Sequence, residues 1–290
     1  MNEPQRPRVI LNISGIRQDT VAYAQRIVDM AREFDVHAGI SLTLMGAYRQ
    51  YPSEERTLWR LRDDEAALAF VHDCQSRGHE MLLAGLGPIG VTTKPSDKAP
   101  RVLDKRSLEK AEFRRLGRHE SNLRIAAAQR QLESLGLLTT VFAPVRWSAS
   151  EPALAAAAKC GFNVVAEAYS VRGCVPSRKT LKHIELPEGT APLRSEGEQW
   201  VVFPNRVLAI GDGFGGEKWW RRQVKSSAQR MAEQYRTIRL SVNAGKAHKA
   251  GVIDDVRKTI ERLQSYGYVG GRYAEYAESL NLPERSDSVA

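Results

Sequence analysis

The chain has 290 residues, a formal net charge of +9 at pH 7 and a pI near 9.6. No Ser/Gly-rich linker divides it, and α/β barrels of comparable length fold as one domain. The apolar stretches are too short to cross a bilayer, and residues 1–8 are polar, without the apolar run of a secretory signal. We therefore expect no membrane span and one domain at residues 8–280, with polar tails at 1–7 and 281–290.

The number and spacing of the cysteines indicate a cellular compartment, and the net charge indicates a class of partner. Cys74, Cys160 and Cys174 are far apart, and no Cys-x-x-Cys spacing occurs. This argues against a zinc knuckle and favours reduced thiols, so we expect a cytoplasmic protein. The excess of Lys and Arg indicates an anionic partner, although composition alone is weak evidence for nucleic acid, which is not the partner we expect.

The predicted elements alternate between strands and helices along the chain. Apolar runs predict the strands, and a period of 3.6 residues predicts the helices. The expected strands are 8–14, 37–45, 79–87, 137–148, 162–170, 207–213 and 237–243, and the expected helices are 19–34, 63–77, 112–136, 150–161, 216–234 and 252–266. Residues 268–276 complete the alternation, while 46–62 read as an irregular excursion, 88–106 as a surface loop and 171–204 as a small irregular sheet or flap.

Such alternation is typical of parallel strands joined by crossover helices, which places a site at the carboxyl ends of the strands. The seven expected strands are one fewer than a complete (β/α) barrel contains. The residues that end or closely follow a strand are expected around one mouth of this barrel: Ser14, Ala84, Pro144, Glu167, Asp212 and Asn243.

Residues 142–147, with the sequence FAPVRW, lie at the carboxyl end of one of these strands. They resemble the Pro-aromatic loop of the polysaccharide deacetylase-like (NodB-homology) superfamily, in particular a divergent intracellular actinobacterial branch of unknown function. The resemblance can be followed over most of residues 8–276. It implies an α/β fold with a deformed seven-stranded (β/α) barrel and, where the motifs are complete, metal-dependent deacetylation of a carbohydrate.

The resemblance also implies metal ligands and a catalytic base at three places, and this sequence departs from the pattern at each. An Asp-Asp or His-Asp pair would follow the first strand, where residues 13–19 read ISGIRQD. A His-x-x-x-His-like motif would follow the third strand, where residues 83–88 read LAGLGP, and Asn243 stands where related sequences often carry a histidine. Catalytic zinc and iron need carboxylate and imidazole ligands. We therefore predict degenerate metal-binding motifs, no metal site of the usual kind and no cofactor.

The remaining histidines do not replace these ligands. His79 begins like an H-E-x-x-H motif, but Leu83 stands in place of the second histidine. His248 follows the last strand on the side of the mouth, and we keep it as the one functional candidate among the histidines. Four others begin strands at the opposite end or lie in helices: His37, His79, His72 and His119.

Two glycine-rich segments are similar to anion-binding loops. Residues 85–90 match G-x-G-x-x-G, but residues 91–100 cannot begin the required helix, so we do not expect dinucleotide binding there. Residues 211–216 lie between a strand and a helix whose N-terminal amides can hold an anion, with Lys218, Arg221 or Arg222 nearby. The alternative for this segment is a turn that needs positive φ angles.

The mouth supplies candidate residues for catalysis and for binding. Without a metal, acid–base chemistry has three carboxylates and one histidine: Asp19, Glu167, Asp212 and His248. Glu167 stands in an apolar strand, so it points either to the barrel interior or to the ligand mouth, and a buried structural pair with an arginine is the alternative. Trp147 and one of the adjacent Trp219 and Trp220 offer indole faces that suit a sugar ring. The candidate ligand-binding residues are Ser14, Arg17, Pro144, Arg146, Trp147, Trp219 and Asn243.

The leading hypothesis is a deacetylase-like protein without metal-dependent hydrolase activity, which binds a sugar-like or anionic small molecule or acts as a scaffold. One alternative is an active carbohydrate deacetylase with relocated ligands drawn from Asp19, Asp212 and His248. The other is a basic nucleic-acid- or phosphate-binding protein that uses Arg221, Arg222, Lys225 and Lys246. The sequence leaves the ligand and the oligomeric state open.

Overall fold

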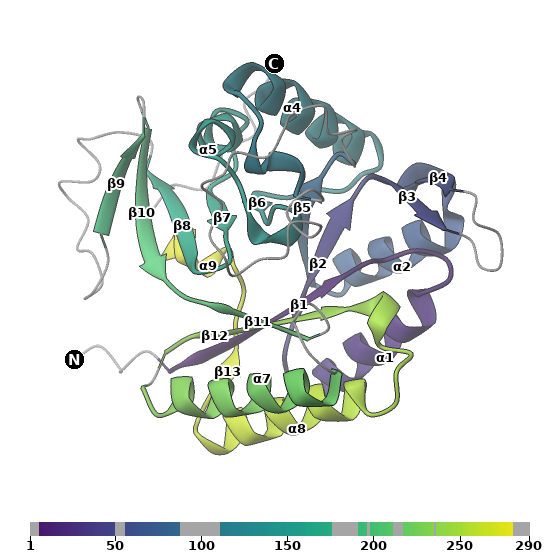
Figure 1. Cartoon of the computed structure of the whole chain (residues 1–290), viewed down its shortest axis with the longest axis vertical. Coiled ribbons are helices and arrows are strands. Elements are labelled where there is room, and N and C mark those ends of the chain that lie inside the picture. Colours follow the sequence, from purple (N-terminus) through teal and green to yellow (C-terminus); the bar gives the residue numbers. More distant parts are fainter. Residues whose placement is uncertain are drawn as a thin grey trace.

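The computed structural model describes residues 6–49, 56–87, 111–175, 191–195, 198–210, 217–234 and 236–280. Strands gather at the centre of the molecule, and helices surround them (Figure 1). Seven strands form a barrel wall: β1 (Arg8–Ser14), β2 (Ala38–Thr43), β5 (Glu80–Gly85), β6 (Val141–Phe142), β7 (Val164–Ala166), β11 (Val207–Ile210) and β12 (Ile238–Asn243). Each runs parallel to its neighbours in the order β11-β12-β1-β2-β5-β6-β7.

The two ends of this row of strands meet at a seam. Val207 N–H donates to the carbonyl of Ala168, and Asn205 N–H donates to the carbonyl of Tyr169, both at 2.9 Å. The fold is therefore the deformed seven-stranded barrel that the sequence predicted. Beyond β7 the sheet continues antiparallel through β8 (Ser170–Val175), β10 (Glu198–Pro204) and β9 (Ala191–Ser195), where an irregular sheet was expected.

Helices cover the outer face of the barrel (Figure 1). They are α1 (Val21–Arg32), α2 (Glu65–Ser76), α4 (Arg118–Ser134), α5 (Glu151–Lys159), α7 (Glu217–Ala232) and α8 (Val252–Ser265), with the short α9 (Glu275–Glu278). Side-chain caps begin two of them, because Asp64 accepts the N–H of Ala67 at 2.9 Å and Ser150 accepts that of Ala153 at 3.3 Å. None of the helices in the described part of the chain is long and apolar enough to cross a membrane.

Alternation along the strands separates two apolar cores. On β1, Val9, Leu11 and Ile13 belong to the large core between the barrel and the helices, whereas Ile10 belongs to a smaller core inside the barrel. The inner core contains Ile10, Leu82, Val141, Ala143, Val164, Ala166, Val171 and Tyr273. The barrel interior is therefore packed and not an open channel.

The C-terminal segment closes the end of the barrel where the strands begin. The Glu80 carboxylate accepts the N–H groups of Tyr273 and Ala274 at 2.8 and 2.7 Å, and Arg8 forms an ion pair with Glu275 at 2.6 Å. This segment also adds β13 (Val269–Gly270) beside β1. The opposite end, where the strands finish, is the mouth.

Three predicted elements differ from the structure. The excursion at 46–62 contains a hairpin of β3 (Met45–Arg49) and β4 (Arg56–Arg60), followed by a 3₁₀ helix at Leu61–Asp63. The helix expected from residue 112 begins at Arg118, because Glu112 turns inward in a separate 3₁₀ helix (Glu112–Arg114). The strand expected at 137–148 has only two paired residues, Val141 and Phe142. The loop predicted at 88–106 lies outside the described residues.

Candidate functional site

The strand register brings most of the predicted mouth residues to one end of the barrel. Ser14 lies opposite Asn243 on neighbouring strands, while Phe142 pairs with both Leu83 and Val165. The pair Ser14 and Asn243 therefore shares the mouth with the residues that follow Leu83, Phe142 and Val165, which are Ala84, Pro144 and Glu167. Asp212 and the glycine-rich segment 211–216 lie outside the described residues, as do residues 88–90 of the other glycine-rich segment.

Asn243 braces two loops at this mouth. Its Oδ1 atom accepts the N–H of Gly245 at 2.9 Å, and a Cβ atom added to Gly15 would lie only 2.8 Å from the same oxygen. Gly15 has a φ of 74°, and its carbonyl accepts the Thr20 hydroxyl at 2.7 Å. A side chain at Gly15 is therefore strained by both backbone and contact, and Asn243 already has a structural partner.

Asp19 is held by its neighbour Arg17. The guanidinium donates to both carboxylate oxygens, Nε to Oδ1 at 2.9 Å and Nη2 to Oδ2 at 2.8 Å. This hydrogen bonding lowers the pKa of Asp19, with partial burial acting in the opposite direction. An ionised carboxylate that is paired with a cation is a poor proton acceptor, so its candidacy as a catalytic base stays a prediction without support from its setting.

Glu167 forms the arginine pair that the sequence left as an alternative. Arg172 Nε donates to Glu167 Oε2 at 2.5 Å, and Ser170 lies at 3.5 Å from the same oxygen. Burial raises the pKa of Glu167, whereas Arg172 lowers it. The pair anchors the start of β8 to the end of β7, and this arrangement is compatible with a structural role.

The described mouth does not fit a catalytic metal of the usual kind. His248 is exposed, its Nδ1 lies 2.9 Å from the Gly245 carbonyl, and its ring meets the Tyr23 ring edge-on. Within the ranges that the structure describes, no three His, Cys, Asp or Glu side chains gather where they can share a metal ion. The donors near the strand ends are a hydroxyl at Ser14, an engaged amide at Asn243 and the Glu167 carboxylate, which is paired with Arg172. A hydroxyl and an amide are weak partners for zinc or iron.

The loop after β6 is strained and docks into the barrel. Arg146 and Trp147 have φ angles of 63° and 55°, which cost about 1–2 kcal/mol each for residues other than glycine. Trp147 N–H donates to the Pro144 carbonyl at 2.7 Å, and the Trp147 carbonyl accepts the N–H of Ala168 at 2.9 Å. Consecutive residues held in this conformation are typical of functional loops, because surrounding contacts must keep them there.

Arg239 is the residue on which this loop packs, and the sequence analysis did not select it. It is fully buried on β12, and its guanidinium lies 5.7 Å from the centre of the half-buried Trp147 ring. Its Nε donates to Asn205 Oδ1 at 3.0 Å, and its Nη2 donates to the carbonyls of Glu167, at 2.6 Å, and Asn205. A charge within an apolar strand was the available signal, since burial requires such partners. The proposed stacking role of Trp147 stays a prediction.

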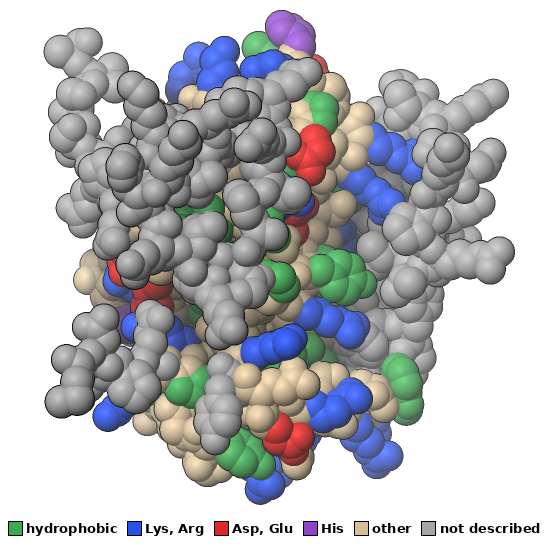
Figure 2. Space-filling view, turned by 90° about the vertical axis from the view of Figure 1, so that its left-hand side faces the viewer, with side chains coloured by type: hydrophobic (Ala, Val, Ile, Leu, Met, Phe, Trp, Pro, Cys, Tyr) green, Lys and Arg blue, Asp and Glu red, His purple; other side chains and the backbone are tan. Residues whose placement is uncertain are grey.

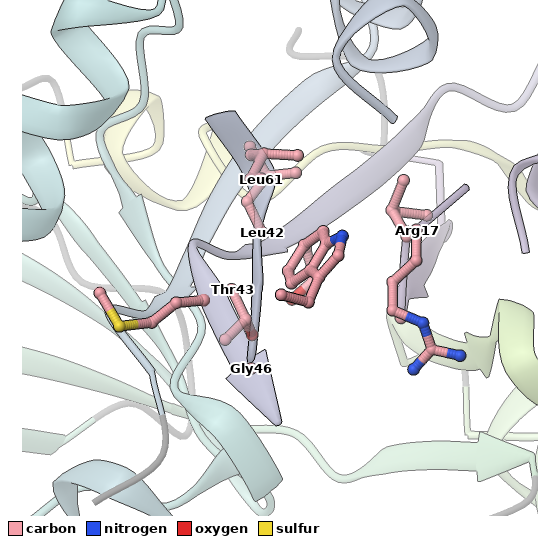
Figure 3. A pocket seen from close by; sticks show the side chains of 10 residues that line it. Arg17, Leu42, Thr43, Gly46 and Leu61 are labelled. Atoms are coloured by element: carbon pink, nitrogen blue, oxygen red, sulfur yellow. The ribbon is translucent and has the colours of Figure 1, made fainter. Parts of the chain in front are cut away.

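A pocket of about 150 Å³ opens beside the ends of β1 and β2. Arg17 stands on one side, and Leu42, Thr43 and Leu61 lie on the other (Figure 3). Trp59 from β4 also lines this pocket, and the sequence analysis missed it. Its indole N–H donates to Oδ2 of the buried Asp64 at 2.7 Å, which fixes the orientation of the ring.

The basic helix α7 carries the other predicted residues. Trp219 is 51% exposed, and the side chain of Trp220 lies outside the described residues, so the binding role of this pair stays a prediction. Asp255 forms ion pairs with Arg221, at 3.2 Å, and with Lys225. These two cations are therefore partly neutralised, which weakens the case for a phosphate site on this face.

A second buried carboxyl group, missed from the sequence, lies beside the end of β5. Glu112 Oε2 accepts the N–H of Gly87 at 3.1 Å, and Oε1 accepts Arg124 at 3.1 Å. Burial raises the pKa of Glu112 to about 7. A pKa in this range also occurs in catalytic acids, but the side chain packs against Gly85 on the helix-facing side of the strand.

The sequence matches no protein-family profile and no curated protein. Solved structures do match, at low identity. A putative polysaccharide deacetylase from Mycobacterium smegmatis has a TM-score of 0.58 at 10% identity, covering 100% of this chain and 97% of that one. A CE4 family pseudoenzyme from Bacillus anthracis has a TM-score of 0.50 at 13% identity, covering 96% and 67%. A family 4 acetyl xylan esterase from Clostridium thermocellum, in complex with cobalt, has a TM-score of 0.51 at 12% identity, covering 95% and 92%.

These similarities define the class of fold. The chain has the polysaccharide deacetylase-like barrel, as its resemblance at residues 142–147 implied. At 10–13% identity the likeness concerns the fold alone, and proteins with this fold include both an esterase and a pseudoenzyme. The activity must therefore be argued from the side chains at the mouth.

Proposed function

We propose that this protein binds an acidic sugar at the mouth of its deacetylase-like barrel and does not hydrolyse it with a metal. The observation that carries this proposal is the pocket beside β1 and β2, which combines the Arg17 cation with the Trp59 ring. An indole face covers the apolar face of a pyranose, and a ligand carboxylate can pair with the Arg17 guanidinium by displacing Asp19, whose side chain is 61% exposed. The pocket of about 150 Å³ is smaller than most ligand sites, so it suits a single sugar ring.

The setting of Arg17 and Trp59 supports a binding role. Asp64 is buried and accepts three hydrogen bonds, from the indole of Trp59 and from the backbone N–H groups of Gln18 and Ala67. This single carboxylate therefore links the Trp59 ring to the loop that carries Arg17. Such preorganisation lowers the entropic cost of binding a ligand between them.

The chemistry of the candidate catalytic groups supports the absence of metal-dependent hydrolysis. Asp19 and Glu167 each pair with an arginine, and the Asn243 amide braces a loop. Metal ligation at these positions would require the present partners to be displaced. The fold itself is compatible with loss of activity, because one protein of this fold is described as a pseudoenzyme.

The test is a calorimetric titration of the full chain with glucuronic acid and with N-acetylglucosamine. Arg17→Gln should weaken glucuronate binding about 10-fold, since a charge-assisted contact contributes at least about 1.4 kcal/mol. The same variant should leave N-acetylglucosamine binding unchanged. Trp59→Leu should weaken the binding of both sugars because it removes the stacking face.

Arg62→Gln is the matched control, because Arg62 is an exposed arginine in the adjacent 3₁₀ helix and does not line the pocket. The proposal fails if neither sugar binds at millimolar concentration, or if Arg17→Gln and Arg62→Gln have the same effect. Deacetylation of N-acetylglucosamine that a chelator abolishes would support the alternative of an active enzyme.

A further inference from the structure

A second and larger pocket, of about 410 Å³, lies outside the barrel at the seam where β7 meets β11. Its walls come from the turn after β7, the start of β11 and the last turns of α7. This volume lies within the range of about 300–1,000 Å³ that is common for small-molecule sites. Among the described residues that line this pocket, none was a candidate from the sequence.

Three arginines from three different segments line the pocket. Arg206 precedes β11, Arg230 lies on α7, and Arg236 lies between α7 and β12. Among the described residues, the lining contains no Asp or Glu, and none of the three arginines forms an ion pair. Lys and Arg side chains also gather on the lower half of this side of the molecule, with few Asp or Glu between them (Figure 2). Uncompensated guanidinium groups around one concavity raise the local concentration of anions.

The pocket also has an aromatic wall and an apolar floor. Tyr169 is 58% exposed, and the Arg206 guanidinium lies 5.9 Å from the centre of its ring. Leu208 and Met231 supply apolar surface between the arginines. A tyrosine exposed to this extent beside a cation offers a stacking face for a ring that carries an anionic group.

The rim of the pocket is fixed to the barrel interior. Asn205 lines the pocket, donates through Nδ2 to the Thr237 carbonyl at 2.7 Å and accepts the buried Arg239 at 3.0 Å. Its backbone N–H closes the seam by donating to Tyr169. The segment that carries Arg206 is therefore held by buried hydrogen bonds, so Arg206 is presented from a preorganised turn.

We propose that this seam pocket binds a small phosphate ester, with Arg206, Arg230 and Arg236 around the phosphate and Tyr169 against the attached ring. A planar guanidinium donates two parallel hydrogen bonds to two phosphate oxygens. Three arginines around one pocket therefore suit a phosphate better than a single carboxylate. A nucleoside phosphate and a sugar phosphate share this chemistry. The site is separate from the acidic-sugar pocket, because the described linings of the two have no residue in common.

A small ligand is favoured over nucleic acid by the shape of the site. The three arginines surround one concavity, whereas single nucleic-acid-binding modules bury about 600–1,000 Å² along an extended surface. On the α7–α8 face, Asp255 interrupts the basic surface by pairing with Arg221 and Lys225. The basic residues therefore do not form a continuous stripe between these two places.

The test is a titration of the full chain with inorganic phosphate, adenosine 5′-monophosphate and glucose 6-phosphate, with adenosine as the uncharged comparison. The double variant Arg230→Gln/Arg236→Gln removes two exposed cations that have no described ion-pair partner, so the fold should be retained. It should weaken binding of both esters at least about 10-fold. Arg222→Gln/Arg262→Gln is the control, since it removes two exposed arginines of α7 and α8 outside this pocket.

Tyr169→Ala distinguishes a nucleoside phosphate from a sugar phosphate as the ligand. It should weaken adenosine 5′-monophosphate more than inorganic phosphate if a ring stacks there, and the ester that loses more affinity identifies the preferred ring. The proposal is overturned if no phosphate ester binds, if the control weakens binding as much as the double variant, or if adenosine binds as tightly as its monophosphate. Tighter binding of a long single-stranded RNA through the same arginines would also overturn it, in favour of a nucleic-acid surface.

Discussion

The buried carboxyl group of Glu112 should make the stability of the protein depend on pH. Its side chain is almost completely buried between Gly87 and Arg124, and burial raises its pKa from 4.5 to about 7. A raised pKa in the folded state means that the contribution to stability is complete below pH 4.5 and is lost as the pH rises through 7. Between pH 5.5 and 8, ionisation of this one group should therefore lower the free energy of unfolding by about 2 kcal/mol.

Glu112→Gln isolates this contribution. The amide keeps the shape of the side chain but cannot accept hydrogen bonds at both terminal atoms, which costs about 1 kcal/mol at every pH. The difference in unfolding free energy between wild type and variant should then shift by about 2 kcal/mol in favour of the variant between pH 5.5 and pH 8. Urea denaturation at a series of fixed pH values measures this difference.

Glu120→Gln is the control, because it removes a partly exposed carboxylate from the same Arg124. It should cost less than about 1 kcal/mol, as expected for a surface ion pair. A difference between wild type and Glu112→Gln that stays constant from pH 5.5 to 8 would refute the reasoning about burial.

Two further substitutions and one labelling experiment test the site and its supports. Gly15→Ala should lower the free energy of unfolding in urea denaturation by about 1–3 kcal/mol, because its φ is positive and the new methyl group meets Asn243. Trp147→Ala should lower it by about 2 kcal/mol, roughly half the cost for a fully buried tryptophan; no loss would show that the ring does not support the barrel. Burial raises the pKa of Cys74 to about 12, so iodoacetamide should modify it at pH 8 only after unfolding, as mass spectrometry can establish.

The barrel could be predicted because its strands and helices carry strong local signals. β1 (RVILNIS) is mostly apolar, and β12 (IRLSVN) alternates apolar and polar residues. The Asp64 and Ser150 caps begin helices where expected. Seven parallel strands followed from the alternation alone. The hairpin of β3 and β4 was missed because its strands, MGAYR and RTLWR, are short and lack a regular alternation of apolar and polar residues.

The site could be predicted only in part, because local sequence patterns do not show which distant segments come into contact. The mouth positions of Ser14, Pro144 and Asn243 follow from strand ends. Trp59 is held at the pocket by its hydrogen bond to Asp64. The sequence pattern identified Asp64 only as the start of a helix. Arg239 donates to backbone carbonyl groups and to a side-chain amide. These partners carry no negative charge, so no acidic residue in the sequence indicates where the buried guanidinium is paired.

The most direct test of the central claim is the zinc content of the full chain after incubation with excess zinc and exhaustive dialysis. Our account predicts much less than one zinc per chain, because Asp19, Glu167 and Asn243 already have other partners. One zinc per chain that is lost in Asp19→Ala or His248→Ala would contradict it. That result would instead establish an active centre with relocated ligands.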